Sequence, residues 1–276
     1  MLSSGPGPNP VQPRPFRRPF NRQPAIMHIS RRVLSSIAFV ISLAAPVASL
    51  AQAPAAAPPP PPRREATAEF AYVGTNGNSS TTSIGLGGQY IYRPEEWTLT
   101  TKAAYVKNES QGVLSAESFD ALFKAERALG PRLSTFGRYG FLHDRFAGIE
   151  ARNIIEGGLN YLLINAAPQT LNVDASFGYA HESRVDPPDL SDPLFATGAV
   201  YRLKLSEAVD LSDDARFSVA ISNGDDWRFA NIASVNSKLN SFLSLKFSNT
   251  IRYVHAPAPT FKTTDTITAV ALVAKF

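Results

Sequence analysis

The sequence predicts an all-β fold: a transmembrane antiparallel β-barrel of about 12 strands, preceded by a signal peptide and a proline-rich linker. Three observations predict it. From Ala66 onward, apolar and polar residues alternate in segments of about ten residues separated by turn-forming residues, which is typical of membrane-crossing strands. A signal-like segment precedes the alternation. The last strand ends on an aromatic residue, Phe276.

Residues 1–53 predict a signal peptide with an upstream extension. Met27 is followed by two arginines, an apolar run over 33–43 and the small-residue end Ala51-x-Ala53, so we expect translation from Met27 and cleavage after Ala53. An uncleaved membrane anchor is the alternative, but the apolar run is short for a spanning helix. Residues 54–65 contain consecutive prolines and predict a stiff, extended linker, with the barrel at 66–276.

The basic character of the chain belongs to its first segment. Residues 1–53 hold six of the 27 arginines and lysines and no acid, so removing them leaves 21 basic against 23 acidic residues. A nucleic-acid partner is therefore not expected. The chain has no cysteine, which excludes disulfides and thiolate metal sites.

Alternation places the strands in order. The clearest segment is 171–182, where Leu171, Val173 and Phe177 share one face and Asn172 and Asp174 the other. A soluble β-sandwich is the alternative fold, but it would not explain the terminal aromatic strand. The expected strands are 66–74, 82–93, 96–107, 114–127, 132–143, 152–164, 169–182, 194–206, 213–222, 227–239, 241–255 and 264–276.

The connections alternate between two kinds. Tight turns are expected at 93–95, 129–131 and 239–240, and longer polar loops at 108–112, 144–151, 183–193, 223–226 and 256–263. Short turns on one side and long loops on the other match the periplasmic and extracellular ends of outer-membrane barrels. An even number of strands then places both termini in the periplasm.

The face opposite the apolar one is expected to line a lumen. It carries 11 bases and 7 acids, which predicts a narrow pore with a weak preference for anions. The alternative is a closed structural barrel whose charges pair and fill the interior. The inward bases are Lys102, Lys124, Arg138, Arg202, Lys204, Arg216, Arg228, Lys238, Lys246, Arg252 and Lys275, and the acids are Glu69, Asp120, Glu126, Glu156, Asp174, Glu182 and Asp265.

Three histidines, His143, His181 and His255, are expected at the extracellular rim. A histidine beside a serine would be the start of a lipid hydrolase, and a serine within hydrogen-bond reach of one ring is the feature that would favour this alternative. No G-x-S-x-G motif surrounds them, so we predict no enzymatic activity.

Acidic residues cluster in two of the expected loops. Asp186, Asp189 and Asp192 share one loop and Asp225-Asp226 another, but neither fits a calcium-binding loop. We therefore interpret them as solvated loop charges. No metal or cofactor is predicted.

The terminal strand carries Val270, Leu272 and Phe276 on one face, which resembles the C-terminal assembly signal of outer-membrane barrels. We therefore expect a protein of the Gram-negative outer membrane, inserted by the barrel-assembly machinery. Its other expected partners are outer-membrane lipid, lipopolysaccharide and small ions or solutes.

Several segments carry a family resemblance. They are 70–83, with its Gly-Asn-Ser-Ser-Thr piece, 136–149, with Asp-Arg-Phe-Ala-Gly, and the shorter pieces 224–227 and 262–267. These segments resemble the family of salt-induced outer-membrane proteins, a domain family of unknown function. The resemblance covers residues 66–276. It implies an outer-membrane barrel with a role under salt stress, and it brings no catalytic residues.

Overall fold

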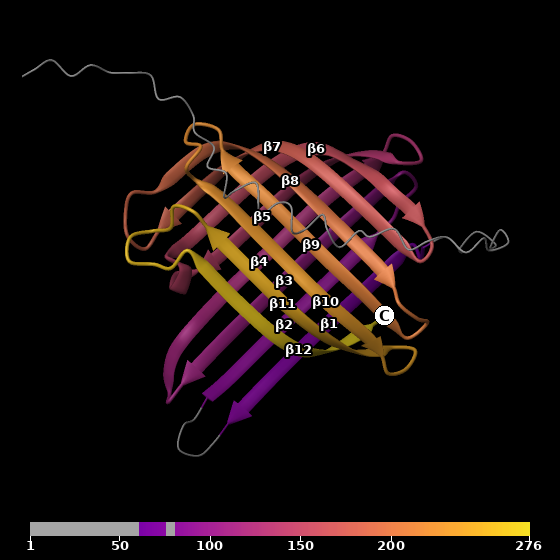
Figure 1. Ribbon diagram of the computed structural model, residues 1–276, viewed down its shortest axis with the longest axis horizontal. Coiled ribbons are helices and arrows are strands. Elements are labelled where there is room, and N and C mark those ends of the chain that lie inside the picture. Colours follow the sequence, from indigo (N-terminus) through magenta and orange to yellow (C-terminus); the bar gives the residue numbers. More distant parts are fainter. Residues whose placement is uncertain (1–60, 76–80) are drawn as a thin grey trace, which may run out of the picture. The chain divides into compact units, whose positions relative to one another are not determined.

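The computed structural model describes residues 61–75 and 81–276 (Figure 1). The predicted signal peptide, 1–53, and most of the predicted linker lie outside the described residues. Residues 61–63 precede the first strand, which begins at Arg64.

Twelve antiparallel strands form a closed barrel in which each strand pairs with its neighbours in sequence and the first strand pairs with the last. The predicted fold class is therefore confirmed. The strands are β1 (Arg64–Thr75), β2 (Thr81–Tyr92), β3 (Trp97–Ser110), β4 (Val113–Ala128), β5 (Leu133–Asp144), β6 (Ile149–Ala166), β7 (Gln169–Arg184), β8 (Leu190–Lys204), β9 (Val209–Ala220), β10 (Trp227–Lys238), β11 (Leu243–Val254) and β12 (Thr264–Lys275).

Each strand overlaps its predicted range. The largest shifts fall where predicted loops proved to be strand: β8 begins at Leu190 and β9 at Val209, each four residues earlier than expected. Between β5 and β6 lies a single 3-10 turn, η1 (Arg145–Ala147). No helix in the described part of the chain is long and apolar enough to cross a membrane.

The alternation of the sequence becomes an apolar outer wall. Phe177 is 65% exposed and Ile155 64% exposed, and both face outward from neighbouring strands. Exposing such a large apolar surface to water is unfavourable, so this outer wall is suited to contact with the hydrocarbon of a membrane.

The two ends of the barrel differ. One end, here called the terminal end, carries the start of β1 and the end of β12, and Phe276 exchanges two backbone hydrogen bonds with Ala66 there. The opposite end, here called the loop end, carries the connections β3–β4, β5–β6, β7–β8, β9–β10 and β11–β12. Of these, the β11–β12 loop (255–263) is the longest that the structure describes.

The seam between β1 and β12 is the shortest of the strand pairings. It holds four register pairs, from Thr67↔Lys275 to Phe70↔Leu272. By contrast, β1 pairs with β2 along its whole length, from Arg64 to Thr75.

Candidate functional site

Ion pairs between distant strands identify the inner face of the barrel. Arg252 of β11 pairs with Asp120 of β4 at 3.3 Å, although four strands separate them around the ring. The register carries this face from strand to strand. It places on it all the residues of the predicted lumen, namely Glu69, Lys102, Asp120, Lys124, Glu126, Arg138, Glu156, Asp174, Glu182, Arg202, Lys204, Arg216, Arg228, Lys238, Lys246, Arg252, Asp265 and Lys275.

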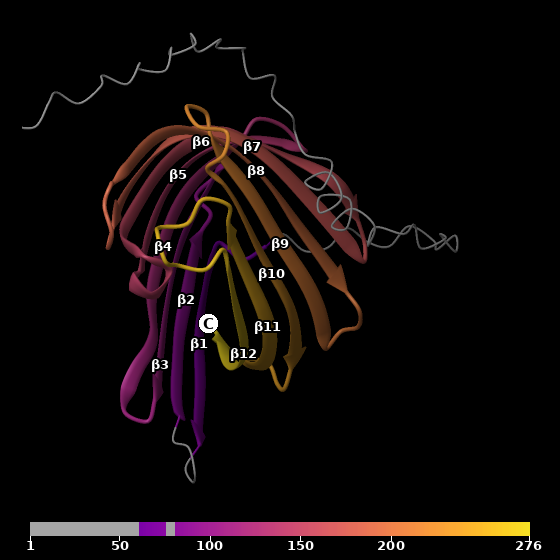
Figure 2. The same cartoon turned by 60° about the vertical axis from the view of Figure 1, so that its left-hand side comes forward.

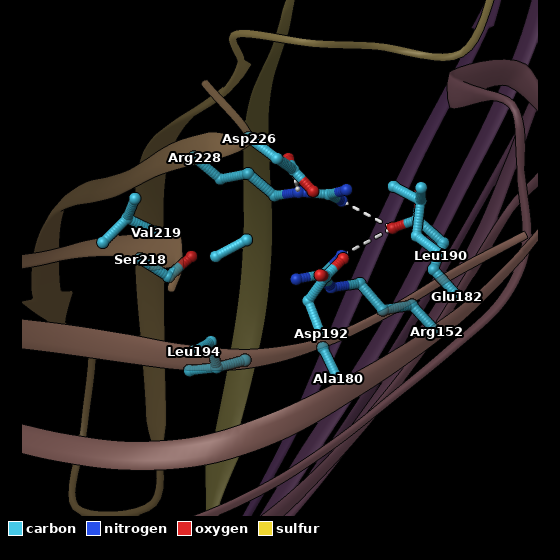
Figure 3. Close-up of a pocket in the computed structure, with 11 residues that line it drawn as sticks. Arg152, Ala180, Glu182, Leu190, Asp192, Leu194, Ser218, Val219, Asp226 and Arg228 are labelled. Atoms are coloured by element: carbon cyan, nitrogen blue, oxygen red, sulfur yellow. Dashed lines mark hydrogen bonds and ion pairs between the residues drawn. The ribbon is translucent and has the colours of Figure 1, made fainter. Parts of the chain in front are cut away.

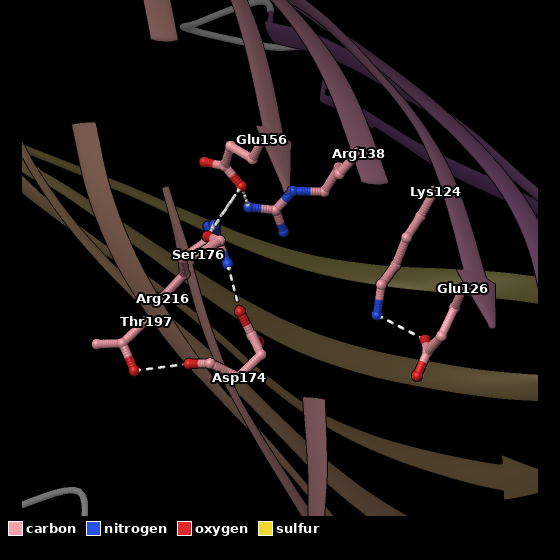
Figure 4. A network of polar contacts seen from close by, with 8 residues as sticks. All are labelled: Lys124, Glu126, Arg138, Glu156, Asp174, Ser176, Thr197 and Arg216. Carbon is pink, nitrogen blue, oxygen red and sulfur yellow. Dashed lines mark hydrogen bonds and ion pairs between the residues drawn. The ribbon is translucent and has the colours of Figure 1, made fainter. Parts of the chain in front are cut away.

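Glu156 of β6 is the centre of the middle network, shown in Figure 4. Its side chain is 2% exposed and pairs with Arg138 of β5 and, at 2.5 Å, with Arg216 of β9. Arg216 also reaches Asp174 of β7 at 3.1 Å. Gly198 makes room for this arrangement, because a Cβ there would lie 2.4 Å from a carboxylate oxygen of Asp174. The network therefore crosses the lumen from β5, β6 and β7 to β9.

A second acid, Glu126, is the centre of a separate group of contacts nearer the terminal end. Lys124 donates to it at 2.7 Å and Asn160 at 3.0 Å, and the hydroxyl of Ser134 also donates to it. The ammonium of Lys124 lies 4.5 Å from the centre of the Phe136 ring, where a cation–π attraction adds to the pair.

Glu182 of β7 is the centre of the loop-end network, shown in Figure 3. Its side chain, 2% exposed, pairs with Arg152 at 2.6 Å, Arg184 at 2.8 Å and Arg228 at 2.7 Å. The pocket that Arg152, Glu182 and Arg228 line has a volume of about 10 Å³, which is about the space that one water molecule needs. Little free space therefore remains in this pocket beside the Glu182 carboxylate.

Two bases of β11, Lys246 and Arg252, form further ion pairs with other strands. Lys246 donates to both carboxylate oxygens of Glu69 on β1, at 2.8 and 2.9 Å, passing over β12. Arg252 reaches Asp144 of β5 at 3.5 Å in addition to Asp120.

The remaining inward bases differ in how they are held. Lys275 pairs with Glu65 at 3.0 Å. Among the described residues, Lys102, Arg202, Lys204 and Lys238 form no ion pair, and Lys238 donates to the carbonyl oxygen of Glu207 at 3.0 Å. Lys102 lies on β3, and Arg202 and Lys204 lie on β8.

Sequence reasoning missed several inward charges. Two are bases, Arg152 and Arg184. With five acids they bring the inner face of the strands to 13 bases and 12 acids, so the predicted excess of four bases falls to one. Most lay in or beside predicted loops, where alternation gives no face. The five acids are Glu65, Asp144, Asp192, Asp210 and Asp214.

The lumen nevertheless retains space. Ile232 of β10 faces inward, because its register partners Asp214 and Thr250 do, yet it is 42% exposed. Arg202, also inward, is exposed too. An inward side chain can be exposed only where solvent has room beside it, so the interior next to β8 and β10 is hydrated.

The β11–β12 loop crosses the mouth at the loop end, as Figure 2 shows. A Cβ placed on Gly148, which follows η1, would lie 2.8 Å from a ring carbon of Phe261 and 2.9 Å from the Cβ of Ala258. Arg184 of β7 donates to the carbonyl oxygen of Ala256 at 3.3 Å. Since β12 and β6 lie opposite each other in the ring, these contacts span the opening.

The three rim histidines lie near the loop end. His181 of β7 has its Nδ1 2.7 Å from the hydroxyl of Ser191, its register partner on β8. His255 stacks on Trp227 with ring centres 5.0 Å apart. His143 contacts the carbonyl oxygen of Glu150 at 2.6 Å. The serine partner that the hydrolase alternative required is therefore present at His181.

The acidic loop residues do not converge. Asp189 accepts the backbone N–H of Arg184 at 3.1 Å, and Asp192 accepts from Ser222. Within residues 61–75 and 81–276, no three histidine or acidic side chains are grouped as a metal site requires.

The residues of the predicted assembly signal lie on the outer wall. Val270 is 50% exposed, Leu272 44% and Phe276 77%. The first two face outward beside Phe70 of β1 and Phe247 of β11.

Several solved structures have a similar overall arrangement. A NanC porin matches with a TM-score of 0.42 and 7% identity over 77% of this chain and 97% of that chain. The translocator domain of the autotransporter NalP from Neisseria meningitidis matches with a TM-score of 0.44 and 11% identity over 79% and 89%. A FadL homologue from Pseudomonas aeruginosa matches with a TM-score of 0.35 and 9% identity over 79% and 76%. At this level of similarity, no activity transfers from these barrels to this chain.

No curated protein matches the chain. A family model does: it is described as protein of unknown function, DUF481, and matches residues 68–276, which is nearly the whole barrel. The chain therefore belongs to the DUF481 family.

Proposed function

We propose that this protein is an outer-membrane channel of a Gram-negative bacterium, with a narrow, hydrated lumen for small ions or solutes. The observation that carries the proposal is the exposure of inward-facing Ile232, since it requires solvent space inside the ring. Two features support placement in a membrane. The outer wall is apolar, and the closed barrel pairs the edges of its strands along most of its circumference, so few backbone groups face hydrocarbon without a partner. A role under salt or osmotic stress is part of the proposal, on the family resemblance alone.

The route through this channel is restricted. Ion pairs of Glu156 with Arg216 and of Glu182 with Arg228 cross the lumen from β6 and β7 to β9 and β10, and the β11–β12 loop covers the mouth. Small ions are therefore the solutes that the described space fits best. The remaining selectivity rests on Lys102 and Arg202, whose charges are not neutralised by an ion pair within the described chain.

The test is the single-channel conductance of the protein purified from outer membranes, measured in planar bilayers under a salt gradient. We expect discrete steps with a weak anion preference. Lys102→Gln with Arg202→Gln should shift the reversal potential toward cations, because fewer fixed positive charges face the passing ion. Arg127→Gln is the control, since Arg127 pairs with Glu96 outside the lumen and is exposed. Silence from folded protein in every variant would instead support the closed structural barrel.

A second candidate function is favoured by one contact, between His181 and Ser191. Histidine as general base and serine as nucleophile is the pairing that ester hydrolysis uses, and both residues face outward near the loop end. The prediction that the chain has no enzymatic activity thus stays a prediction. A fluorophosphonate probe, which labels nucleophilic serines, tests for a hydrolase. Labelling that is lost in Ser191→Ala and kept in Ser183→Ala would support a hydrolase, and the absence of labelling would exclude one.

A further inference from the structure

The wall of the barrel is incomplete on one side. Beyond Phe70↔Leu272, no pair joins the described residues of β1 and β12. Residues 71–75 of β1 pair with β2 alone, and residues 264–271 of β12 pair with β11 alone. The loop half of the seam therefore presents two facing strand edges whose backbone groups lack their cross-seam partners.

The inner wall beside this seam is unlike the rest of the lumen. On β1–β3 the inward positions next to it are small or apolar, and the same holds for inward positions 267–271 of β12, whereas Asp265 is charged. The networks of Glu156 and Glu182 lie across the barrel, on β5–β10, and a base near the loop half of the seam is Arg252 of β11, which reaches Asp120 of β4. The inward residues beside the seam are Ala71, Gly85, Gly87, Ala104, Val106, Ile267, Ala269 and Ala271.

An ion pair stands where the pairing stops. Glu69 and its partner Val273 form the second-last register pair of the seam. Lys246 reaches Glu69 from β11, over the inner face of β12, at 2.8 Å. This pair holds the closed part of the seam together and leaves the loop half free to separate.

We propose that the loop half of the β1–β12 seam is a lateral passage between the lumen and the membrane, suited to small amphipathic molecules. An unpaired strand edge in hydrocarbon is unfavourable because its N–H and C=O groups have no partner. A molecule with a polar group and an apolar body satisfies both parts of this site: the edges bind its polar group, and the small apolar wall holds its body. Access from the loop end is covered by the β11–β12 loop, which makes the side of the barrel the freer exit.

This inference rests on the proposed channel, because it uses the same lumen. It differs in substrate class: ions pass along the axis, whereas the seam admits molecules that dissolve in lipid. The two are therefore tested by different readouts on the same variants.

The chain lends itself to a cross-linking test, because it has no cysteine. Continuing the register by one residue would bring Ala71 opposite Ala271, so Ala71→Cys with Ala271→Cys closes the passage on oxidation. The matched control is Ala68→Cys with Ala274→Cys, which joins two alanines already paired in the closed part of the same seam. A second variant, Ala104→Phe, fills the passage without any cross-link.

We measure how fast the apolar fluorophore 1-N-phenylnaphthylamine enters cells that produce each variant in their outer membrane. Planar-bilayer conductance is measured in parallel. We expect dye entry to fall to the level of cells without the protein in the oxidised Ala71/Ala271 variant and in Ala104→Phe, and to stay unchanged in the control. Equal dye entry in all variants would overturn the lateral passage. Dye entry that depends on the seam in a protein with no ionic conductance would retain the passage and reject the ion channel.

Discussion

At the scale of single residues, the lumen is organised by a few buried acids that each hold several bases. Glu182 binds three guanidinium groups from β6, β7 and β10 while its own side chain is 2% exposed. Glu156 holds two. Because opposite charges share one site, neither partner is buried without compensation, and the acids act as the fixed points of the network.

Replacing Glu182 by Gln tests this arrangement. Buried Arg152 and half-buried Arg184 would lose their counter-charge and Arg228 would keep only Asp226, and breaking a buried pair in this way typically costs about 3–5 kcal/mol. We expect a corresponding loss in the free energy of unfolding, measured by urea denaturation of the barrel in lipid vesicles. Glu96→Gln is the control: its pair with Arg127 is exposed and should contribute less than about 1 kcal/mol. Equal losses in both variants would contradict the interpretation.

At the scale of elements, the β11–β12 loop is positioned by the close fit of its side chains against Gly148. Its turn places Pro259 before Thr260, which has a φ of +72°, and the backbone N–H of Phe261 donates to the carbonyl oxygen of Ala258 at 3.1 Å. This turn presents Ala258 and Phe261 to Gly148, whose own φ is +77°. The absence of a side chain at 148 is what lets the loop lie across the mouth.

Gly148→Ala should therefore displace the loop and increase conductance in planar bilayers. The added methyl group would lie within about 3 Å of two loop residues, closer than carbon atoms approach. Gly112→Ala is a matched control, because Gly112 has a φ of +76° and nothing within 4 Å of its Cβ position. The two variants share the backbone strain and differ only in the clash. Unchanged conductance in Gly148→Ala would mean that the loop does not limit the passage.

The last strand has its own test. Phe276→Ala removes an outward ring but keeps the two backbone hydrogen bonds to Ala66. If Phe276 is part of an assembly signal, this variant should reach the outer membrane in several-fold lower amount, measured by heat-modifiable gel mobility of membrane fractions. Phe242→Ala, which removes another exposed ring near the same end, should have little effect. Similar amounts of both variants would reject the assembly signal and leave Phe276 an outward aromatic residue without a role in assembly.

The elements themselves could be predicted from the sequence, because alternation with a period of two is a local property. All twelve strands follow it. The boundaries moved most at Leu190 and Val209, where polar residues continue the pairing past the apolar pattern. The contact of Phe261 with Gly148 and the pair Lys246–Glu69 could not be predicted, since they depend on which strands face each other across a closed ring.

At the scale of the whole molecule, the predicted inward residues lie on one face, but the balance of charge differs from the expectation. Asp210 and Asp214 precede or begin a strand that was expected to start at 213, and Arg184 lay in a predicted loop. The sequence pattern assigned no face to Asp210 and Arg184, whereas Asp214 shares its face with Arg216 in the expected strand and was missed. The contact between His181 and Ser191 could not be predicted from the sequence either, because it depends on the register between β7 and β8.

The predicted route of the chain through the cell also belongs to this scale. We expect the protein in the outer-membrane fraction to begin at Pro54, after removal of the segment that contains Ala51-x-Ala53. Separating inner from outer membranes shows which membrane holds the protein, and amino-terminal sequencing of the purified protein shows its first residue. A start upstream of Pro54, or recovery in the inner membrane, would contradict the cleaved signal peptide.

The ion pairs that cross the lumen also have a consequence for how the barrel forms. Their acids lie on β1–β7 and their bases on β9–β11, and two of these contacts join residues 132 and 177 positions apart. Some acids of the amino-terminal half already pair with bases of the same half, as Glu156 does with Arg138, but its inner face keeps an excess of negative charge until the carboxyl-terminal half supplies further bases. Contacts so distant in sequence form late and slowly. Closing the ring is then favoured by attraction between its two halves as well as by strand pairing, so this barrel gains its final electrostatic stabilisation in the same step that completes its wall.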